Sequence, residues 1–174
     1  MYNFYTLNPN HQTSAQNPSS SISLDVNQTL TNTTFYKLFS EYYHDNTSEE
    51  KQDRLAQHLN TINYLIAFTG NNSVTDINSL KTFTINSKDD LNLLICTTEE
   101  REVYLPAFTD TSEIIHFTNE PIFTLTVPAK WLWKFILSQK NFNGIVFNPG
   151  TIGWDISLEH IQSLLDDINT DSNA

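Results

Sequence analysis

Two polar segments follow apolar runs in the sequence and could hold side chains for binding or catalysis. The segment Phe108-Thr109-Asp110 ends the run VYLPAF, and Asn148 ends the run GIVF just before Pro149-Gly150. A hydroxyl, a carboxylate and an amide at the ends of two strands can gather beside one sheet and bind a polar ligand. Free backbone N–H groups at the start of a helix after Asp110 would add donors for an anion. These side chains form the first candidate site.

Local structure alone can also explain both segments. Asp110 and Glu113 have the spacing of a capping box, and Phe108 would then fill the core. Proline at 149 biases Asn148 toward extended dihedrals, and Pro149-Gly150 suits a type II turn in which Gly150 takes the positive φ. We favour the cap for Asp110. The turn does not use the amide of Asn148, which could bind its own backbone or a ligand.

Three tryptophans are the second set of candidate binding residues. Trp131 and Trp133 lie two positions apart on one predicted helix, so their rings point to different faces and cannot both be fully buried. One of them, together with Trp154, could anchor a protein partner, because Trp is frequent at binding hot spots. Partial burial of all three rings as ordinary packing is the alternative that we favour.

No combination of residues in the sequence indicates a reaction. The five histidines are scattered, there is no Gly-x-Ser-x-Gly motif, and Cys96 lies in the apolar run LLICT, where we expect a buried and unreactive thiol. Paired cysteines, His-x3-His and a calcium-binding loop are missing, and the four glycines form no phosphate-binding loop. We therefore expect no metal, no cofactor and no nucleotide, and we lean toward a protein that is not an enzyme.

The acidic balance restricts the partners and the compartment. The 174 residues carry a formal charge of −11, which repels nucleic acid and anionic membrane surfaces. No apolar run is long enough to span a membrane, and no basic segment followed by an apolar stretch opens the chain. The single cysteine, Cys96, cannot form an internal disulfide. We expect a cytoplasmic protein that binds neither nucleic acid nor membrane.

The C-terminal part of the predicted domain has acids but no Lys or Arg. After Lys140 the chain has no further Lys or Arg and five acids, which are Asp155, Glu159, Asp166, Asp167 and Asp171. A helix with an acidic outer face could dock a basic partner. An ordinary solvated face is the alternative that we favour.

The elements that would position these residues are a mixture of helices and strands. Apolar spacing predicts a helix from residue 33, a second helix from a capping box at Thr47 and Glu50, a short helix over 111–117, a helix after Pro128 and a last helix from an N-cap at Ser157. Strands are expected over 64–69, 81–86, 91–97, 103–109, 122–127 and 144–147. Pro106 should end its strand or place it at an edge.

We divide the chain into three parts. Residues 1–31 are rich in Ser, Thr, Asn, Gln and Pro, and we expect a flexible tail. Residues 32–170 form a single α+β domain, and residues 171–174 form a flexible C-terminus.

The motifs LPAFTDTSE at 105–113, GIVFNPG at 144–150 and the helix SLEHIQSLL resemble the N-terminal domain of the SseB family, the enhanced serine sensitivity proteins. The resemblance covers roughly residues 33–168, and the run YLIAFT matches the first apolar strand of the family. It implies an α+β fold with one curved mixed sheet packed with helices. It implies no catalytic residues, because no reaction is established for this domain. The long polar N-terminus and the sequence Phe68-Thr69-Gly70, where a proline often ends the first strand, depart from the family pattern.

We therefore expect a non-catalytic, cytoplasmic SseB-like module that binds a protein or a small metabolite. The alternative is a metabolite-binding domain or enzyme connected with amino-acid metabolism, in particular serine metabolism or tolerance. That alternative would place a cleft between the Phe108-Asp110 turn and the Asn148-Gly150 turn. The sequence leaves the identity of the partner and the oligomeric state open.

Overall fold

The structure is a computed structural model, and it describes residues 3–7, 22–26, 29–70, 82–85, 91–118 and 122–171. Nine strands of the described chain form one sheet in the order β4-β2-β7-β3-β5-β6-β8-β9, with β1 paired to β5. The strands are β1 (Asn3–Leu7), β2 (Ile22–Val26), β3 (Asn63–Gly70), β4 (Thr82–Ile85), β5 (Leu91–Thr97), β6 (Val103–Phe108), β7 (Phe123–Pro128), β8 (Gly144–Phe147) and β9 (Trp154–Ser157). The pair β6–β8 is parallel and the others are antiparallel, so the sheet is mixed.

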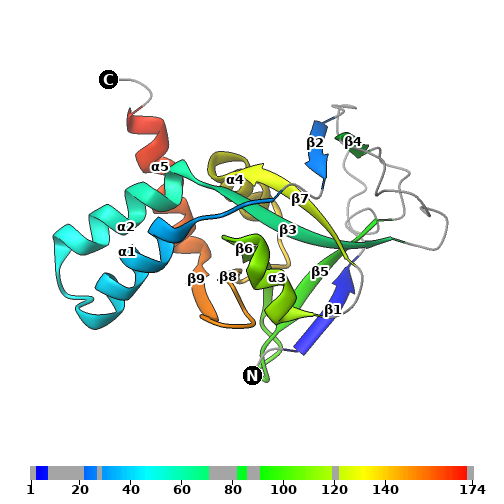
Figure 1. Cartoon of the computed structure of the whole chain (residues 1–174), viewed down its shortest axis with the longest axis horizontal. Coiled ribbons are helices and arrows are strands. Elements are labelled where there is room, and N and C mark those ends of the chain that lie inside the picture. The colour runs from blue at the N-terminus through cyan, green and yellow to red at the C-terminus, as the bar shows by residue number, and fades with distance from the viewer. Residues whose placement is uncertain are drawn as a thin grey trace.

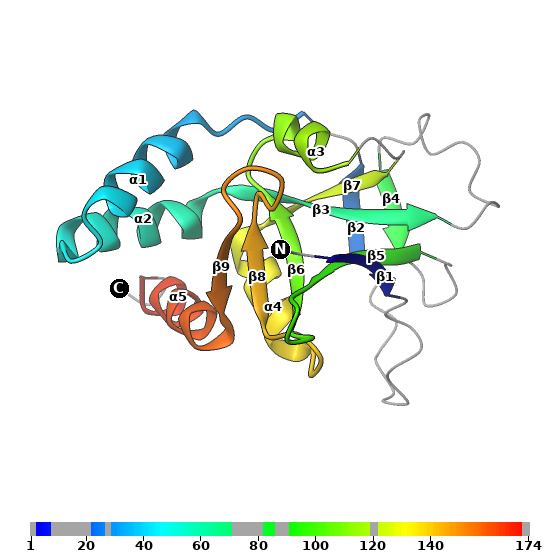
Figure 2. The same cartoon turned by 90° about the horizontal axis from the view of Figure 1, so that it is seen from below.

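Five helices of the described chain cover this sheet. They are α1 (Thr33–His44), α2 (Glu49–Thr61), α3 (Thr111–Phe117), α4 (Ala129–Ser138) and α5 (Leu158–Asp171). Helices α1, α2 and α5 gather at the end of the molecule beside β9, while β2 and β4 lie at the opposite end (Figures 1 and 2). The predicted α+β fold with a curved mixed sheet and packed helices is confirmed. No helix in the described part of the chain is both long and apolar enough to cross a membrane.

The main core lies between the sheet and helices α1, α2, α4 and α5. Its centre is aromatic, because Tyr64 and Phe147 stack at 5.4 Å between ring centroids and Trp133 packs against both rings. Phe35 of α1 joins the same cluster and is fully buried. The apolar face predicted for α1 is therefore the face that closes the core.

Helix α2 begins one residue later than predicted. Its N-cap is Ser48, whose Oγ accepts from the backbone N–H of Lys51 at 3.5 Å. The hydroxyl of Thr47 instead donates to Asp45 at 3.0 Å, in the loop between α1 and α2. The prediction of Thr47 as the cap is therefore wrong, because its side chain stabilises the preceding turn.

Pro106 neither ends its strand nor lies at an edge, so that prediction is wrong. Val103 and Ala107 turn their carbonyl groups toward the β8 side, where they accept from Asn143 and Asn148. Successive residues of a strand direct their backbone groups to opposite neighbouring strands, so the nitrogen of Pro106 faces away from β8. On that side β6 pairs with β5 up to Tyr104 and with β3 from Ala107 onward. Pro106 lies between these two pairings, where no backbone N–H is needed for a hydrogen bond between strands, so proline fits inside the sheet.

The N-terminal segment contributes to the sheet. Strand β1 pairs with β5, and β2 pairs with β4 and β7, although both lie within the predicted tail of residues 1–31. The alternation in ISLDV suits a strand, but the polar surroundings hid it. Residues 1–2, 8–21, 27–28 and 172–174 lie outside the described residues, so the flexibility of the two chain ends stays a prediction.

Candidate functional site

The two turns expected to flank a cleft meet directly. The side-chain oxygen of Asn148 accepts from the backbone N–H of Thr109 at 2.9 Å, and its amide nitrogen donates to the Thr109 hydroxyl at 2.8 Å. Both residues are fully buried. Parallel pairing of β6 with β8 brings the two strand ends side by side and so makes this contact possible. We call it the Thr109–Asn148 junction.

The backbone of Asn148 differs from the predicted type II turn. Asn148 has a φ of 45°, and Gly150 is absent from the described residues with positive φ. The carbonyl of Asn148 accepts from the N–H groups of Thr151 and Gly153, both at 3.0 Å, so residues 148–151 still form a closed β-turn, but without the positive φ that a type II turn needs at Gly150. Asparagine tolerates the left-handed region better than most residues, and its buried bonds to Thr109 hold it there.

Gly150 is required for close packing and not for positive φ. A Cβ at this position would lie 2.8 Å from the carbonyl carbon and oxygen of His116, near the end of α3. The turn after β8 therefore packs against the backbone of α3. This contact joins segments that are distant in sequence, and no local pattern indicates it.

Asp110 caps α3, as predicted. Its carboxylate accepts from the backbone and hydroxyl of Ser112, at 2.8 and 2.7 Å, and from the backbone N–H of Asn32 at 3.2 Å. Burial raises the pKa of Asp110, but the hydrogen bonds from Ser112 and Asn32 outweigh it and lower the pKa overall. The cap therefore also fixes the start of α1.

Glu113 does not complete the predicted capping box. It is buried, and its two oxygens accept from the hydroxyl groups of Tyr36, at 2.6 Å, and Thr151. Burial and the neighbouring carboxylate of Glu113 raise the pKa of Tyr36. Glu113 thus links α3 to α1 and to the turn after β8.

These bonds change the interpretation of the first candidate site. Thr109, Asp110 and Asn148 use their polar groups to hold three segments together, and Phe108 is buried against Phe117 with 5.1 Å between ring centroids. The predicted proximity of the two turns is present. The side chains of Thr109 and Asn148 bond to each other, and none of these four residues lines either of the two hollows described below.

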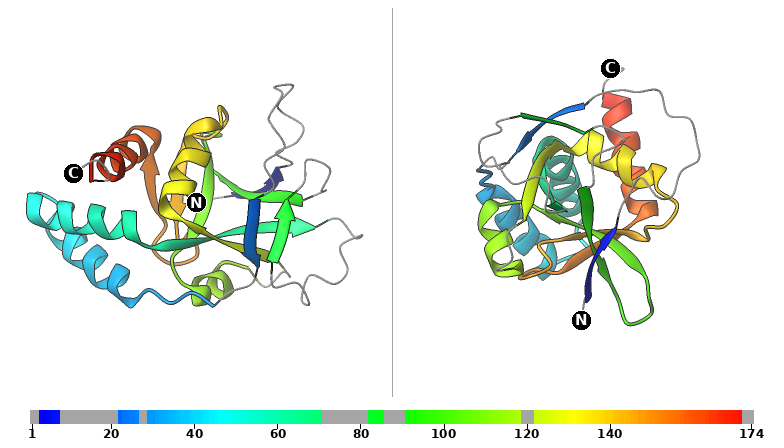
Figure 3. Two further views of the ribbon diagram at one scale, coloured as in Figure 1. Left: turned by 90° about the horizontal axis from the view of Figure 1, so that it is seen from above. Right: turned by 90° about the vertical axis from the view of Figure 1, so that its right-hand side faces the viewer.

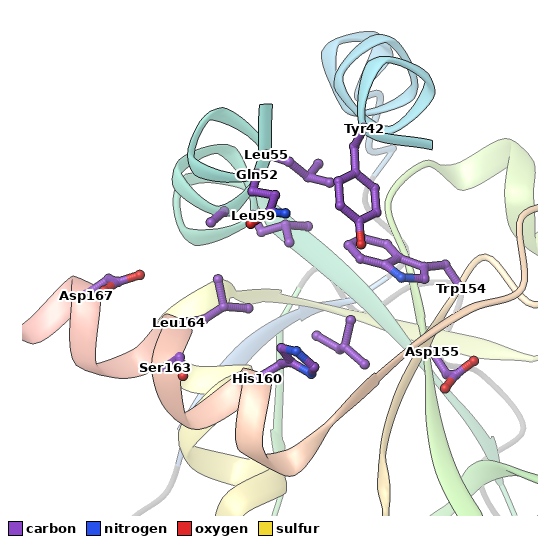
Figure 4. Close-up of a pocket in the computed structure, with 12 residues that line it drawn as sticks. Tyr42, Gln52, Leu55, Leu59, Trp154, Asp155, His160, Ser163, Leu164 and Asp167 are labelled. Carbon is purple, nitrogen blue, oxygen red and sulfur yellow. The ribbon is translucent and has the colours of Figure 1, made fainter. Parts of the chain in front are cut away.

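A groove lies beside β9, between α2 and α5. It has a volume of about 330 Å³ and is lined by α1, α2, β9 and α5. Its apolar lining comes from Leu55, Ala56, Leu59, Ile156 and Leu164, and Tyr42 reaches from α1 toward Trp154 at one end (Figure 4). We call it the α2–α5 groove.

Of the three tryptophans named as candidate binding residues, Trp154 lines this groove. It is half-buried and packs on Phe39, Tyr42 and Phe147, with ring centroids 5.1, 5.7 and 5.6 Å away. Trp133 is fully buried in the core, whereas Trp131 is half-buried and stacks on Phe135 at 5.1 Å. The prediction that Trp131 and Trp133 cannot both be core residues is confirmed, but the buried ring of Trp133 has no surface with which to anchor a partner.

Asn60 joins α2 and α5, the two helices that form the long walls of the groove. Its side-chain nitrogen donates to the carbonyl of Leu164 on α5 at 2.9 Å, and its oxygen accepts from the indole N–H of Trp133 at 2.9 Å. On the other side, Arg54 of α2 forms an ion pair with Glu41 of α1 at 3.1 Å. One amide therefore connects α2 to both α4 and α5.

A second hollow continues the groove along the same two helices. It has a volume of about 720 Å³ and shares Ala56 and Asp167 with the first. Its remaining lining residues are mostly polar, namely Asp53, Gln57, Asn60, Thr61, Ile168 and Thr170. The groove thus passes from an apolar, aromatic end to a polar end.

The groups that could perform chemistry are few in the described residues. Burial raises the pKa of the Cys96 thiol to about 12, so the thiolate is scarce at neutral pH. His160 lines the groove, and its Nδ1 lies 2.9 Å from Ser157 Oγ at the start of α5. Within the described chain, no group of three or more His, Cys, Asp or Glu side chains could hold a metal ion.

The α2–α5 groove was not predicted, because it depends on the packing of helices that are about a hundred residues apart. The sequence did identify the apolar faces of both helices and singled out Trp154. It could not show that the walls stand apart beside β9, a strand that we did not predict. The exposed polar residues between the apolar positions, such as Gln52 and Ser163, carried no signal.

The comparisons with known proteins give one match. The family model described as the SseB protein N-terminal domain matches residues 15–163. No curated protein and no solved structure matches the chain.

Proposed function

This chain belongs to the SseB family, and we propose that it is a non-catalytic module that binds a protein partner in the α2–α5 groove. One observation carries the proposal, which is that four elements converge on an apolar groove with two half-exposed aromatic rings, Tyr42 and Trp154. Clustered aromatic side chains beside an apolar floor are typical of the residues that dominate binding energy at protein interfaces.

The other candidate residues support a structural role elsewhere. The side chains of Thr109, Asp110 and Asn148 are bonded within the fold and buried, so a ligand would have to displace part of this network to reach them. Breaking buried hydrogen bonds without replacing them costs about 1–3 kcal/mol for each unpaired group. A ligand at the Thr109–Asn148 junction is therefore disfavoured relative to one in the groove.

A cytoplasmic location is part of the proposal. Cys96 is a free and buried thiol, and a single cysteine that forms no disulfide suits a reducing compartment.

Site-specific photocrosslinking in cells of the source organism tests this function. The exposed residue Ser163 lines the groove, and it is replaced by p-benzoylphenylalanine. The control carries the same probe at Ile115, which is 70% exposed on α3. We expect a discrete covalent adduct with one protein from position 163 and none from position 115. Equal crosslinking at both positions, or none at either, would contradict the proposal.

A small ligand is the competing function, and a thermal-shift series distinguishes it. Amino acids, including serine, are titrated against the protein and against Ser163→Tyr, which places a large ring in the groove. A ligand that binds the folded state raises the melting temperature with increasing concentration. We expect no such shift. A shift that Ser163→Tyr abolishes would assign the groove to a metabolite instead.

A further inference from the structure

The charges around the α2–α5 groove have one sign. The two hollows are lined by three charged residues in the described chain, Asp53, Asp155 and Asp167, and by no Lys or Arg. Asp53 and Asp167 form no ion pair with any other described residue. Both side chains are exposed, one on each wall of the groove. The polar end of the groove is therefore a region of negative potential above a partly apolar floor.

The Lys and Arg residues of α1 and α2 are paired elsewhere and do not neutralise this region. Lys51 forms an ion pair with Asp45 at 2.8 Å, and both Lys37 and Arg54 are directed to Glu41, at 4.0 and 3.1 Å. These pairs lie within the α1–α2 hairpin. After Lys140 the chain has no further Lys or Arg, so α5 carries four acids and, apart from His160, no basic residue. The groove is thus complementary to a positively charged occupant.

The length of the groove suits a segment of a protein. Lining residues run along α2 from Gln52 to Thr61, which at about 1.5 Å per residue corresponds to a length of about 14 Å. A helix of about ten residues has this length. A small organic cation would occupy only part of it and would leave the apolar floor near Trp154 uncovered.

We infer that the α2–α5 groove accepts a basic amphipathic helix of a partner protein, which seats an apolar side chain beside Tyr42 and Trp154 and places Lys or Arg near Asp53 and Asp167. The order follows from the groove, whose apolar and aromatic end lies at β9 and which continues along α5 to Asp167, away from Trp154 (Figure 4). Helices that dock in grooves use anchors spaced at i, i+3 or i+4 and i+7. The expected motif is an apolar anchor with Lys or Arg one or two helical turns away. This inference rests on the proposed function, and it adds the chemistry of the partner.

A displayed library of random twelve-residue peptides tests the inference and does not require the partner to be identified first. The library is selected against the full chain at low salt, and selected peptides are synthesised and measured by fluorescence anisotropy. Three variants are compared with the wild type. Ser163→Tyr fills the groove, Asp53→Asn with Asp167→Asn removes the acidic pair, and Glu99→Gln with Glu100→Gln removes two charges elsewhere.

The control pair is matched in charge and separated in space. Glu99 and Glu100 are exposed in the loop between β5 and β6, which lies on the opposite side of the molecule from α5 in Figure 3. Asp53, Asp167 and Ser163 are exposed as well, so all three variants should fold like the wild type, which their thermal unfolding checks.

We expect enrichment of peptides that combine an apolar anchor with Lys or Arg. Their affinity should fall about 3- to 10-fold in the Asp53→Asn, Asp167→Asn variant and remain unchanged in the Glu99→Gln, Glu100→Gln variant, because two exposed charge pairs each contribute modestly. Binding should be lost in Ser163→Tyr. Added NaCl should weaken binding to the wild type more than to the Asp53→Asn, Asp167→Asn variant.

The other outcomes separate this inference from the proposed function. Neutral or acidic peptides that bind the wild type but not Ser163→Tyr would overturn the basic partner and leave the groove as a binding site. Spermine that displaces the selected peptides and binds as tightly as they do would assign the acidic pair to a small cation and also overturn the inference. Peptides that bind Ser163→Tyr as well as the wild type, or no enrichment at all, would overturn both proposals.

Discussion

Asn148 stabilises the turn after β8 through its side chain, its backbone N–H and its carbonyl group. In Asn148→Ala, the buried N–H of Thr109 loses its acceptor and alanine must adopt a φ of 45°. We expect the free energy of unfolding to fall by about 2–4 kcal/mol, measured by urea denaturation. Asn148→Gly should lose less, because glycine adopts positive φ without steric cost. A stable Asn148→Ala protein that no longer binds its partner would show that Asn148 is a binding residue.

Gly150 and Gly153 occupy the same turn and offer a matched comparison. A Cβ at Gly150 meets the backbone of His116 at 2.8 Å, whereas a Cβ at Gly153 meets nothing within 4 Å but requires a φ of 59°. We expect Gly150→Ala to lose about 2–3 kcal/mol of stability through overpacking and Gly153→Ala to lose about 1 kcal/mol through its dihedral angle. Chemical denaturation of both variants measures the difference. Equal losses would mean that α3 can shift away from the turn.

At the scale of the elements, Asp110 joins the starts of α1 and α3, and its lowered pKa makes this joint dependent on pH. A carboxyl whose pKa is lower in the folded state stabilises the fold above its unfolded pKa of about 3.9, and this stabilisation is lost as the pH falls through the folded pKa. Asp110→Asn retains a capping oxygen but cannot ionise. We therefore expect the difference in stability between wild type and Asp110→Asn to shrink below about pH 4. Urea midpoints from pH 7 to pH 2 test this, and parallel curves would contradict it.

Asn60 couples the walls of the α2–α5 groove. In Asn60→Ala, the buried indole N–H of Trp133 loses its acceptor, and the carbonyl of Leu164 loses the bond that joins α5 to α2. We expect a loss of about 1–3 kcal/mol and faster amide hydrogen exchange in α5. Thr61→Ala is the control, because Thr61 is exposed and bonds only to the carbonyl of His58 in its own helix. Unchanged exchange in α5 would mean that apolar packing alone holds the walls.

The sequence predicted best those elements that are determined by residues close together in the chain. The apolar face of α1, the Asp110 and Ser157 caps and the strands β3, β5 and β8 follow from spacing and turn chemistry within a few residues. Prediction failed where a distant neighbour decides the outcome. The left-handed Asn148 depends on Thr109, the tolerated Pro106 depends on a change of strand partner, and Glu113 pairs with Tyr36.

The candidate site divides in the same way. The first candidate residues were polar groups at strand ends, and the same donors and acceptors can form hydrogen bonds to a ligand or to a neighbouring turn. Only the position of the partner atoms distinguishes these uses, and parallel pairing of β6 with β8 supplies them. The groove depends on the separation of α2 and α5, so composition indicated only its acidic charge and one of its aromatic rings, Trp154.

At the scale of the whole molecule, the formal charge of −11 opposes the compact state. The screening length is about 30 Å at 0.01 M salt and about 10 Å at 0.1 M, so repulsion across the molecule weakens steeply over this range. We expect the melting temperature to rise between 0.01 and 0.3 M NaCl, with a gain of about 2–4 °C for each 1 kcal/mol of repulsion removed.

The ion pairs of the α1–α2 hairpin act against this trend, because salt weakens attraction as well as repulsion. They are only three, and each is partly exposed, so their combined contribution should be small relative to the excess of acids. The melting temperature of the Glu99→Gln, Glu100→Gln variant should rise less with salt than that of the wild type, because the variant carries fewer repelling charges. A wild-type melting temperature that falls with NaCl would mean that attraction between paired charges outweighs the repulsion among the excess acids.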